Sequence, residues 1–273
     1  MPRVAAEWRN MDNYTIDQIK NLFNLDGKVA VITGGSGVLG EAMAVGLAAY
    51  GAKVVVAGRN QENLDKSVEK ITEAGGEGYA VSCDVNSPEG NEKLVEDAIA
   101  KFGKVDILIA CAGICKRFPA EEFTPDDFKT VIDVNVNGCF LSCQAVGKQM
   151  IKQGTGGKII TISSVRANNG HPLGYAAYAA SKAAVVGLTK QLSTEWAKYG
   201  ILVNSLAPTV VVTPLTKPIF DDPEKAKIFT DRIPLGRPAI ADEIVGTALY
   251  LAAPASDFIT GQTIYVDGGC VAG

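Results

Sequence analysis

Seven short runs of apolar, mostly β-branched residues recur along this chain, and segments of helix length separate them. Such continuous runs are typical of strands with both faces buried, and strands that alternate with helices form parallel sheets. The sequence therefore predicts an α/β fold: a single Rossmann-type domain with a doubly wound, seven-stranded parallel sheet flanked by helices. The expected strands are Val29–Thr33, Val54–Ala57, Tyr79–Ser82, Ile107–Ala110, Ile159–Ile162, Leu202–Leu206 and Thr263–Val266.

The length of 273 residues, 47% of them apolar, suffices for one large core. Residues 1–26 precede the first strand and are interpreted as an extension, with a short helix expected at Thr15–Phe23. Residues 27–273 would form the single domain. Within it, the stretch 208–238 is too long for an ordinary connection and is predicted to be a substrate loop, although an insertion that only packs is the alternative.

Charge and composition exclude several classes of partner. The net charge is −4 and no Lys/Arg run stands out, which argues against nucleic acid and anionic membranes. No apolar run approaches a membrane span and the first ten residues lack a secretory h-region, so a cytoplasmic location is expected. Six cysteines fit neither a zinc spacing nor a disulfide scaffold, so no metal is expected, and Cys139 and Cys143 are predicted to be buried thiols.

A glycine-rich turn, Gly35-x-Gly37-x-x-Gly40, directly follows the first expected strand and opens an apolar helix, Val38–Tyr50. Glycines in this context permit a tight turn and a close approach of the backbone to a pyrophosphate, which the helix N-terminus also attracts. The turn therefore predicts a dinucleotide site, with an ordinary glycine turn as the alternative.

The second expected strand ends in Ala57-Gly58-Arg59-Asn60, where an acidic residue would normally bind the ribose 2′-hydroxyl. An arginine there suits a 2′-phosphate through charge-assisted hydrogen bonds. NADP(H) is therefore the favoured cofactor. NAD(H) stays possible, because Arg59 could be no more than a solvated turn residue.

Tyr178 and Lys182 are four residues apart, so on a helix they share one face, and Ser164 lies fourteen residues before the tyrosine. A nearby ammonium group is expected to lower the pKa of the phenol from about 10 toward working pH. The tyrosine would then exchange protons with a substrate. Such a pair alone is weak, because it also arises by chance.

Taken together, these motifs resemble the short-chain dehydrogenase/reductase family over nearly all of residues 24–269. The matching pieces are Thr33-Gly34 with Gly40, Cys83-Asp84-Val85, Ala112-Gly113, Asn135, Ile162-Ser163-Ser164, Tyr178 to Lys182, Asn204 to Pro208, and Asp267-Gly268-Gly269. The resemblance implies an NAD(P)-dependent oxidoreductase that interconverts a secondary alcohol and a ketone. It also implies a catalytic tetrad of Asn135, Ser164, Tyr178 and Lys182.

In that family pattern Ser164 would hydrogen-bond the substrate oxygen, Tyr178 would exchange the proton, Lys182 would hold the nicotinamide ribose, and Asn135 would position a water. The expected cofactor contacts are Gly34, Ser36, Gly37, Val38, Leu39, Gly40, Arg59, Asn60, Asp84, Val85, Cys111, Ala112, Gly113, Tyr178, Lys182, Pro208, Val211 and Thr213. Three positions depart from the pattern: Val38 and Thr209 replace glycines, and Cys111 replaces an asparagine.

The expected substrate contacts are Arg117, Ser164, Arg166, His171 and Tyr178. Two arginines among hydrogen-bonding side chains favour a sugar, sugar acid or polyol, and the segments around Arg117 and 231–237 are similar to those of gluconate 5-dehydrogenases. A 3-oxoacyl, cyclic-alcohol or steroid reductase is the alternative within the family, and a non-catalytic NADP-sensing protein is the alternative outside it. Apolar residues are spread widely over 176–199 and 241–252, so a homotetramer or homodimer is expected.

Overall fold

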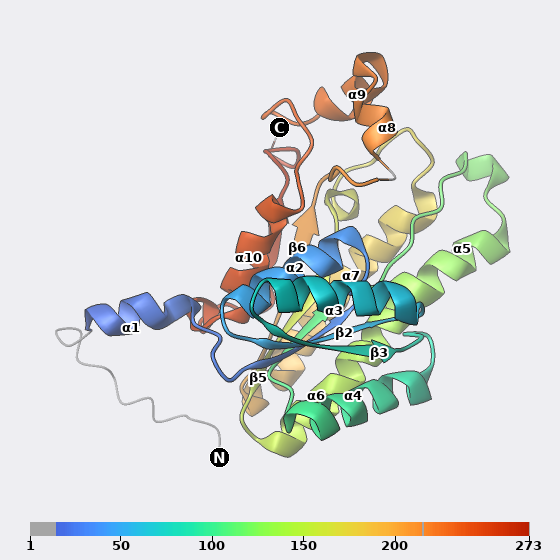
Figure 1. Cartoon of the computed structure of the whole chain (residues 1–273). Coiled ribbons are helices and arrows are strands. Elements are labelled where there is room, and N and C mark those ends of the chain that lie inside the picture. Colours follow the sequence, from blue (N-terminus) through green and yellow to red (C-terminus); the bar gives the residue numbers. More distant parts are fainter. Residues whose placement is uncertain (1–14, 215, 273) are drawn as a thin grey trace.

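The computed structural model describes residues 15–214 and 216–272 (Figure 1). Its seven strands pair in parallel in one sheet, in the order β3-β2-β1-β4-β5-β6-β7, so the predicted fold class is confirmed. The strands are β1 Val29–Thr33, β2 Lys53–Gly58, β3 Glu77–Ser82, β4 Ile107–Ala110, β5 Gly157–Ile162, β6 Ile201–Pro208 and β7 Thr263–Val266.

The bounds of β1, β4 and β7 are those expected from the sequence, and the other four strands extend one or two residues further at one or both ends. The helices that connect successive strands cover the two faces of the sheet (Figure 1). The principal ones are α2 Val38–Ala49, α3 Gln61–Glu73, α4 Pro88–Phe102, α5 Pro125–Ile132, α6 Cys139–Gln153, α7 Ala176–Trp196 and α10 Asp242–Ala252.

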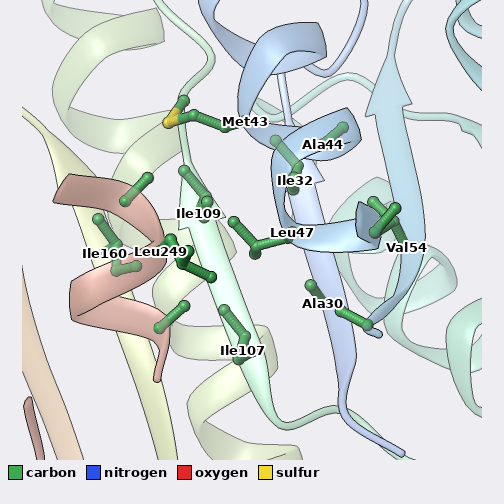
Figure 2. Close-up of a cluster of buried hydrophobic side chains, with 14 of the residues drawn as sticks. Ala30, Ile32, Met43, Ala44, Leu47, Val54, Ile107, Ile109, Ile160 and Leu249 are labelled. Carbon is green, nitrogen blue, oxygen red and sulfur yellow. The ribbon is translucent and has the colours of Figure 1, made fainter. Parts of the chain in front are cut away.

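Each face of the sheet carries its own core, because successive side chains of a strand point to opposite faces. On one face Ile32 and Ile109 pack with Met43 and Leu47 of α2 and Leu249 of α10 (Figure 2). The other face packs alternate strand residues against α4, α6 and α7. Burial on both faces explains why the strands are apolar throughout.

The strand order reverses between β1 and β4: the chain first runs outward to β3, then returns beside β1 and continues to β7. In open parallel sheets, ligands bind outside the carboxyl ends of the strands at such a switch point. The Thr33 hydroxyl joins the two strand ends here, since it accepts a hydrogen bond of 3.3 Å from the amide of Ala112.

The extension before β1 contains the expected helix, as α1 Ile16–Lys20 followed by the 3₁₀ turn η1 Asn21–Phe23. Thr15 caps α1 by accepting from the Gln18 amide at 3.3 Å, and the Gln18 side chain accepts in return from the Thr15 amide. Residues 1–14 lie outside the described part of the chain.

The predicted substrate loop contains two short helices, α8 Lys217–Phe220 and α9 Pro223–Thr230, rather than irregular chain alone. Asp222 caps α9 through its carboxylate, and Pro223 is tolerated because the first helical residue needs no amide donor. Two of the prolines that suggested a loop, Pro218 and Pro223, thus lie at helix starts. Figure 1 shows both helices together at the top of the view.

Candidate active site

Four side chains of the expected catalytic tetrad come from three elements near the carboxyl ends of β4 and β5. Tyr178 and Lys182 lie one turn apart on α7, and Ser164 follows β5. Asn135 belongs to η3 Asp133–Gly138, a π-helical stretch between α5 and α6. π-helical turns within helices are frequent at functional sites.

Lys182 is buried, and its Nζ donates a hydrogen bond of 2.7 Å to the carbonyl oxygen of Ile162, the last residue of β5. The same Nζ lies 5.6 Å from the centre of the Tyr178 ring. The ammonium is therefore anchored to the end of β5 while facing the tyrosine.

The pKa of the Tyr178 hydroxyl is raised above its usual value, chiefly by burial, so the expected lowering by Lys182 is wrong for this structure. Removing water disfavours the charged phenolate, and Cys115 adds to the effect, whereas the neighbouring Ser164 opposes it. Burial also lowers the pKa of Lys182, which weakens the ammonium as a source of stabilising charge. Burial is thus the largest influence on the pKa of both groups.

Ser164 is buried at the start of η4 Val165–Ala167. Its Oγ donates to the carbonyl oxygen of Pro208 at 3.4 Å and accepts from the Arg166 amide at 3.2 Å. The hydroxyl is thereby held between the ends of β5 and β6.

Asn135 uses its whole amide to fix the chain after β4. Its Oδ1 accepts from the Ile114 amide at 2.8 Å, and its Nδ2 donates to the Ile114 carbonyl at 2.9 Å and to Ser181 Oγ at 3.0 Å. A Cβ placed on Gly113 would lie 3.3 Å from Asn135 Oδ1 and 3.5 Å from Lys182 Nζ. Gly113, Asn135 and Lys182 therefore converge on one point of the site.

A cavity of about 780 Å³ lies over the switch point, and most of the expected cofactor contacts line it. Its lining includes Gly34, Ser36, Gly37, Val38, Leu39, Gly40, Arg59, Asn60, Asp84, Val85, Cys111, Ala112, Gly113 and Thr213. The lining fits a dinucleotide, because it joins the glycine turn, the start of α2 and the ends of β2, β3 and β4.

The glycine turn depends on its lack of side chains. Gly34 has φ of +66°, a conformation that favours glycine, and a Cβ on Gly40 would collide with the Gly34 carbonyl oxygen. Gly37 is the N-cap of α2 with φ of −80°, and Val38 is its first helical residue. Valine is therefore accommodated at the position where the family pattern has glycine.

At the end of β2 the two polar residues have different surroundings. Asn60 caps α3, because its Oδ1 accepts from the Asn63 amide at 3.0 Å. Arg59 is exposed on the cavity lining and, among residues 15–214 and 216–272, has no carboxylate within 4.0 Å. Arg59 thus offers an uncompensated charge to the cavity, whereas the Asn60 side chain supports the helix.

Four expected cofactor contacts lie outside this lining: Pro208, Val211, Tyr178 and Lys182. The Val211 carbonyl accepts from Thr216 Oγ1 at 2.8 Å, at the start of the substrate loop. Conversely, the cavity lining contains residues that were not predicted: Gly58, Cys83, Ile114, Val134 and Pro214. Gly58, Cys83 and Ile114 could have been found from their positions at or near strand ends, whereas no sequence signal marks Val134 and Pro214.

Two of the expected substrate contacts, Arg117 and His171, line an open hollow of about 860 Å³ together with Tyr175. Ser164, Arg166 and Tyr178 are not part of its lining. Tyr175 joins the two groups, because its ring centre lies 6.0 Å from that of Tyr178 and 5.9 Å from the Arg166 Cζ.

His171 is mainly a packing residue in this structure. Its ring stacks on Phe229 of α9 at 5.2 Å, and its Nδ1 accepts from the Leu173 amide at 3.3 Å. Burial, together with the charges of Arg166 and Arg232, lowers the pKa of His171 to about 4, so the ring is neutral near pH 7. This histidine connects the substrate loop to the chain after β5.

The cysteines divide by exposure. Cys139 and Cys143 are buried on α6, as predicted, whereas Cys115 is exposed beside the hollow's Arg117. Burial raises the pKa of Cys111 to about 11, so this thiol stays protonated at neutral pH.

In the part of the chain that the structure describes, no three potential metal ligands cluster, and no helix is both long and apolar enough to span a bilayer.

A family model described as enoyl-(acyl carrier protein) reductase matches residues 36–271. The chain is also 43% identical over 254 residues to a 2-dehydro-3-deoxy-D-gluconate 5-dehydrogenase of Dickeya dadantii, covering 93% of this chain and 99% of that protein. The chain belongs to the short-chain dehydrogenase/reductase family. This membership makes it an NAD(P)-dependent oxidoreductase acting on CH–OH groups.

Other members of the short-chain dehydrogenase/reductase family are similarly close. A gluconate 5-dehydrogenase of Gluconobacter oxydans is 40% identical over 252 residues, which cover 91% of this chain and 96% of that protein. The crystal structure of a gluconate 5-dehydrogenase from Burkholderia cenocepacia, in complex with NADP and tartrate, superposes with a TM-score of 0.87 at 39% identity. That match covers 93% of this chain and 98% of the Burkholderia chain.

Proposed function

We propose that this enzyme is an NADP(H)-dependent oxidoreductase of sugar acids or polyols, with Asn135, Ser164, Tyr178 and Lys182 as its catalytic residues. The observation that carries the proposal is the position of Tyr178, which lies between the ammonium of Lys182 and the ring of Tyr175 on the substrate side. Similarity to several sugar-acid dehydrogenases supports the substrate class.

In the proposed reaction the bound cofactor donates or accepts the hydride at the carbinol carbon. Ser164 Oγ hydrogen-bonds the substrate oxygen, and the Tyr178 hydroxyl donates its proton to that oxygen in reduction or accepts one in oxidation. Lys182 holds positive charge beside the phenol, which favours the phenolate when it forms. Asn135 fixes the backbone at Ile114 and so keeps the site's wall in place.

The cofactor preference is proposed from Arg59. An unpaired guanidinium at the cavity lining favours a cofactor with an additional phosphate, because the ion pair forms without displacing a carboxylate. NADP in the Burkholderia structure and in a putative 2-deoxy-D-gluconate 3-dehydrogenase from Agrobacterium tumefaciens supports this preference.

Carboxylate-bearing substrates are favoured because arginines gather on the substrate side of Tyr178. The tartrate in the Burkholderia enzyme, a hydroxylated dicarboxylate, is consistent with this chemistry. A homotetramer or homodimer and a cytoplasmic location remain predictions from the sequence. The remaining expected contacts, Pro208 and Val211 among them, are likewise retained as proposed cofactor contacts.

The test is a panel of sugar acids, polyols, cyclic alcohols and a 3-oxoacyl thioester, followed by the absorbance of the reduced nicotinamide with each cofactor. We expect the highest kcat/KM for a sugar acid with NADP(H). Preferential turnover of the 3-oxoacyl thioester would instead favour the 3-oxoacyl reductase alternative. Cofactor binding without any turnover would favour the alternative of a non-catalytic NADP-sensing protein.

A further inference from the structure

Two arginines near the catalytic tyrosine lack any acidic partner. Of the arginines in residues 15–214 and 216–272, Arg237 is the one with a carboxylate within 4.0 Å, that of Glu243. Arg166 follows β5, and Arg232 follows α9 in the substrate loop, so distant segments supply the two charges. Their guanidinium groups are therefore free to bind an anion from outside the chain.

Both guanidinium groups share one acceptor. Arg166 Nη1 and Arg232 Nη1 each donate to the carbonyl oxygen of Gly170, at 3.2 Å in both cases. A carbonyl carries only partial negative charge, so it cannot compensate two full positive charges. Accordingly the charge of Arg232 adds to burial in lowering the pKa of Arg166.

The arginine pair lies within reach of the site of proton transfer. The Arg166 amide donates to Ser164 Oγ at 3.2 Å, and the Arg166 Cζ lies 5.9 Å from the Tyr175 ring centre. Gly170, to which both arginines bind, lines the open hollow next to Arg117 and Tyr175. Tyr175 is in turn 6.0 Å from Tyr178, ring centre to ring centre, so the Arg166 guanidinium and the catalytic tyrosine lie on either side of one aromatic ring.

His171 adds no charge to this anion site and holds the segment of Arg232 in place. His171, next to Gly170, is neutral near pH 7, and its ring stacks on Phe229 one turn before Arg232. This stacking fixes the segment that carries Arg232. Planar guanidinium groups bind carboxylates through paired hydrogen bonds, which gives the site both charge and shape selectivity.

We propose that Arg166 and Arg232 together bind the carboxylate of the substrate, and that Arg232 makes the enzyme select sugar acids over neutral polyols. This inference rests on the proposed function for the class of substrate. It assigns specificity to Arg232, a residue of the substrate loop. Arg232 completes the site only when Phe229 of α9 is stacked on His171.

The test compares Arg232→Gln with the wild-type enzyme on D-gluconate and D-glucitol, which share a hydroxylated chain and differ in one carboxylate. We expect kcat/KM for D-gluconate to fall about 10- to 150-fold, the loss typical of one hydrogen bond to a charged group. The value for D-glucitol should not change. Equal losses on both substrates, or no loss on D-gluconate, would overturn the proposal.

Arg237→Gln is the matched control, because it removes the same charge from the same loop but from a side chain already paired with Glu243. It should leave both values unchanged. Arg232→Lys retains the positive charge but lacks the paired donors of the guanidinium, so it should recover part of the lost kcat/KM. Such recovery would show that the loss in Arg232→Gln reflects carboxylate recognition and not misfolding. The double variant with Arg166→Gln should lose less than the product of the single effects, because one carboxylate is shared; independent effects would contradict a shared site.

Calorimetric titration of D-gluconate separates this proposal from the proposed function. If the wild-type enzyme turns over neither compound, the proposed function fails, but binding of D-gluconate that Arg232→Gln abolishes still supports the anion site. Absence of D-gluconate binding to the wild-type enzyme refutes the site. Binding that is equally strong in Arg232→Gln refutes it as well.

Discussion

The Nζ of Lys182 donates to the carbonyl oxygen of Ile162 at 2.7 Å, so the end of β5 determines where the ammonium of α7 lies. That ammonium is 5.6 Å from the Tyr178 ring centre. We propose two tasks for the lysine, to stabilise charge on the phenol and to bind the nicotinamide ribose, whereas the proposed main task of the tyrosine is proton transfer. The two residues should be separable by mutation.

Tyr178→Phe should lower kcat by about 10²- to 10⁴-fold, the usual contribution of a positioned proton donor, while cofactor affinity stays nearly unchanged. Lys182→Ala should lower both kcat and cofactor affinity. Steady-state kinetics and fluorescence titration of NADPH measure these effects. Tyr199→Phe and Lys190→Ala, at exposed positions, are the controls. Near-normal kcat in Tyr178→Phe would refute the catalytic assignment.

The raised pKa of Tyr178 predicts different pH dependences for the two directions of reaction. Below this pKa the phenol is protonated, so the proton needed for ketone reduction is available at neutral pH. Alcohol oxidation needs the phenolate, so its kcat/KM should rise about tenfold per unit between about pH 6 and 9. Initial rates in both directions measure this, and an oxidation rate that is flat over that range would contradict it.

Arg59→Ala should weaken NADP(H) binding by about 1.5 to 3 kcal/mol and barely change NAD(H) binding, because the lost hydrogen bonds are to a phosphate. Salt should reduce the wild-type preference, since Arg59 is exposed. The control is Lys66→Ala, which removes the same charge from the exposed face of α3. Equal kcat/KM for both cofactors, unaffected by Arg59→Ala, would remove NADP(H) as the preferred cofactor.

Gly40→Ala should destabilise the fold by about 1 to 3 kcal/mol, because the added methyl group meets the Gly34 carbonyl oxygen inside the turn. NADP(H) affinity should fall with it. Gly246→Ala on α10 is the control: nothing lies within 4 Å of its added Cβ, so a helix-favouring alanine should stabilise by up to about 1 kcal/mol. Urea denaturation measures both. Unchanged stability in Gly40→Ala would contradict the close approach seen here.

The apolar runs predicted the seven strands and their approximate bounds, because a sheet buried on both faces leaves few polar residues in its strands. The glycine turn and Arg59 could be predicted in the same way, since their chemistry depends on their place after a strand. The pKa of Tyr178 could not, because spacing on a helix does not report desolvation. The sequence also did not predict α9, or that Arg166 and Arg232 share the Gly170 carbonyl as acceptor, because both depend on the path of the loop in three dimensions.

In the π-helical stretch Asp133–Gly138, the position of Asn135 depends more on the number of residues in the segment than on their identity. A π turn holds one more residue than an α turn, so deleting a single residue here would restore a regular α-helix. Each residue of an α-helix advances the side-chain direction by about 100°. Asn135 would then turn away from Ile114 and Ser181, although every side chain of the site was still encoded. Insertions and deletions in this segment should thus be selected against even where substitutions are tolerated.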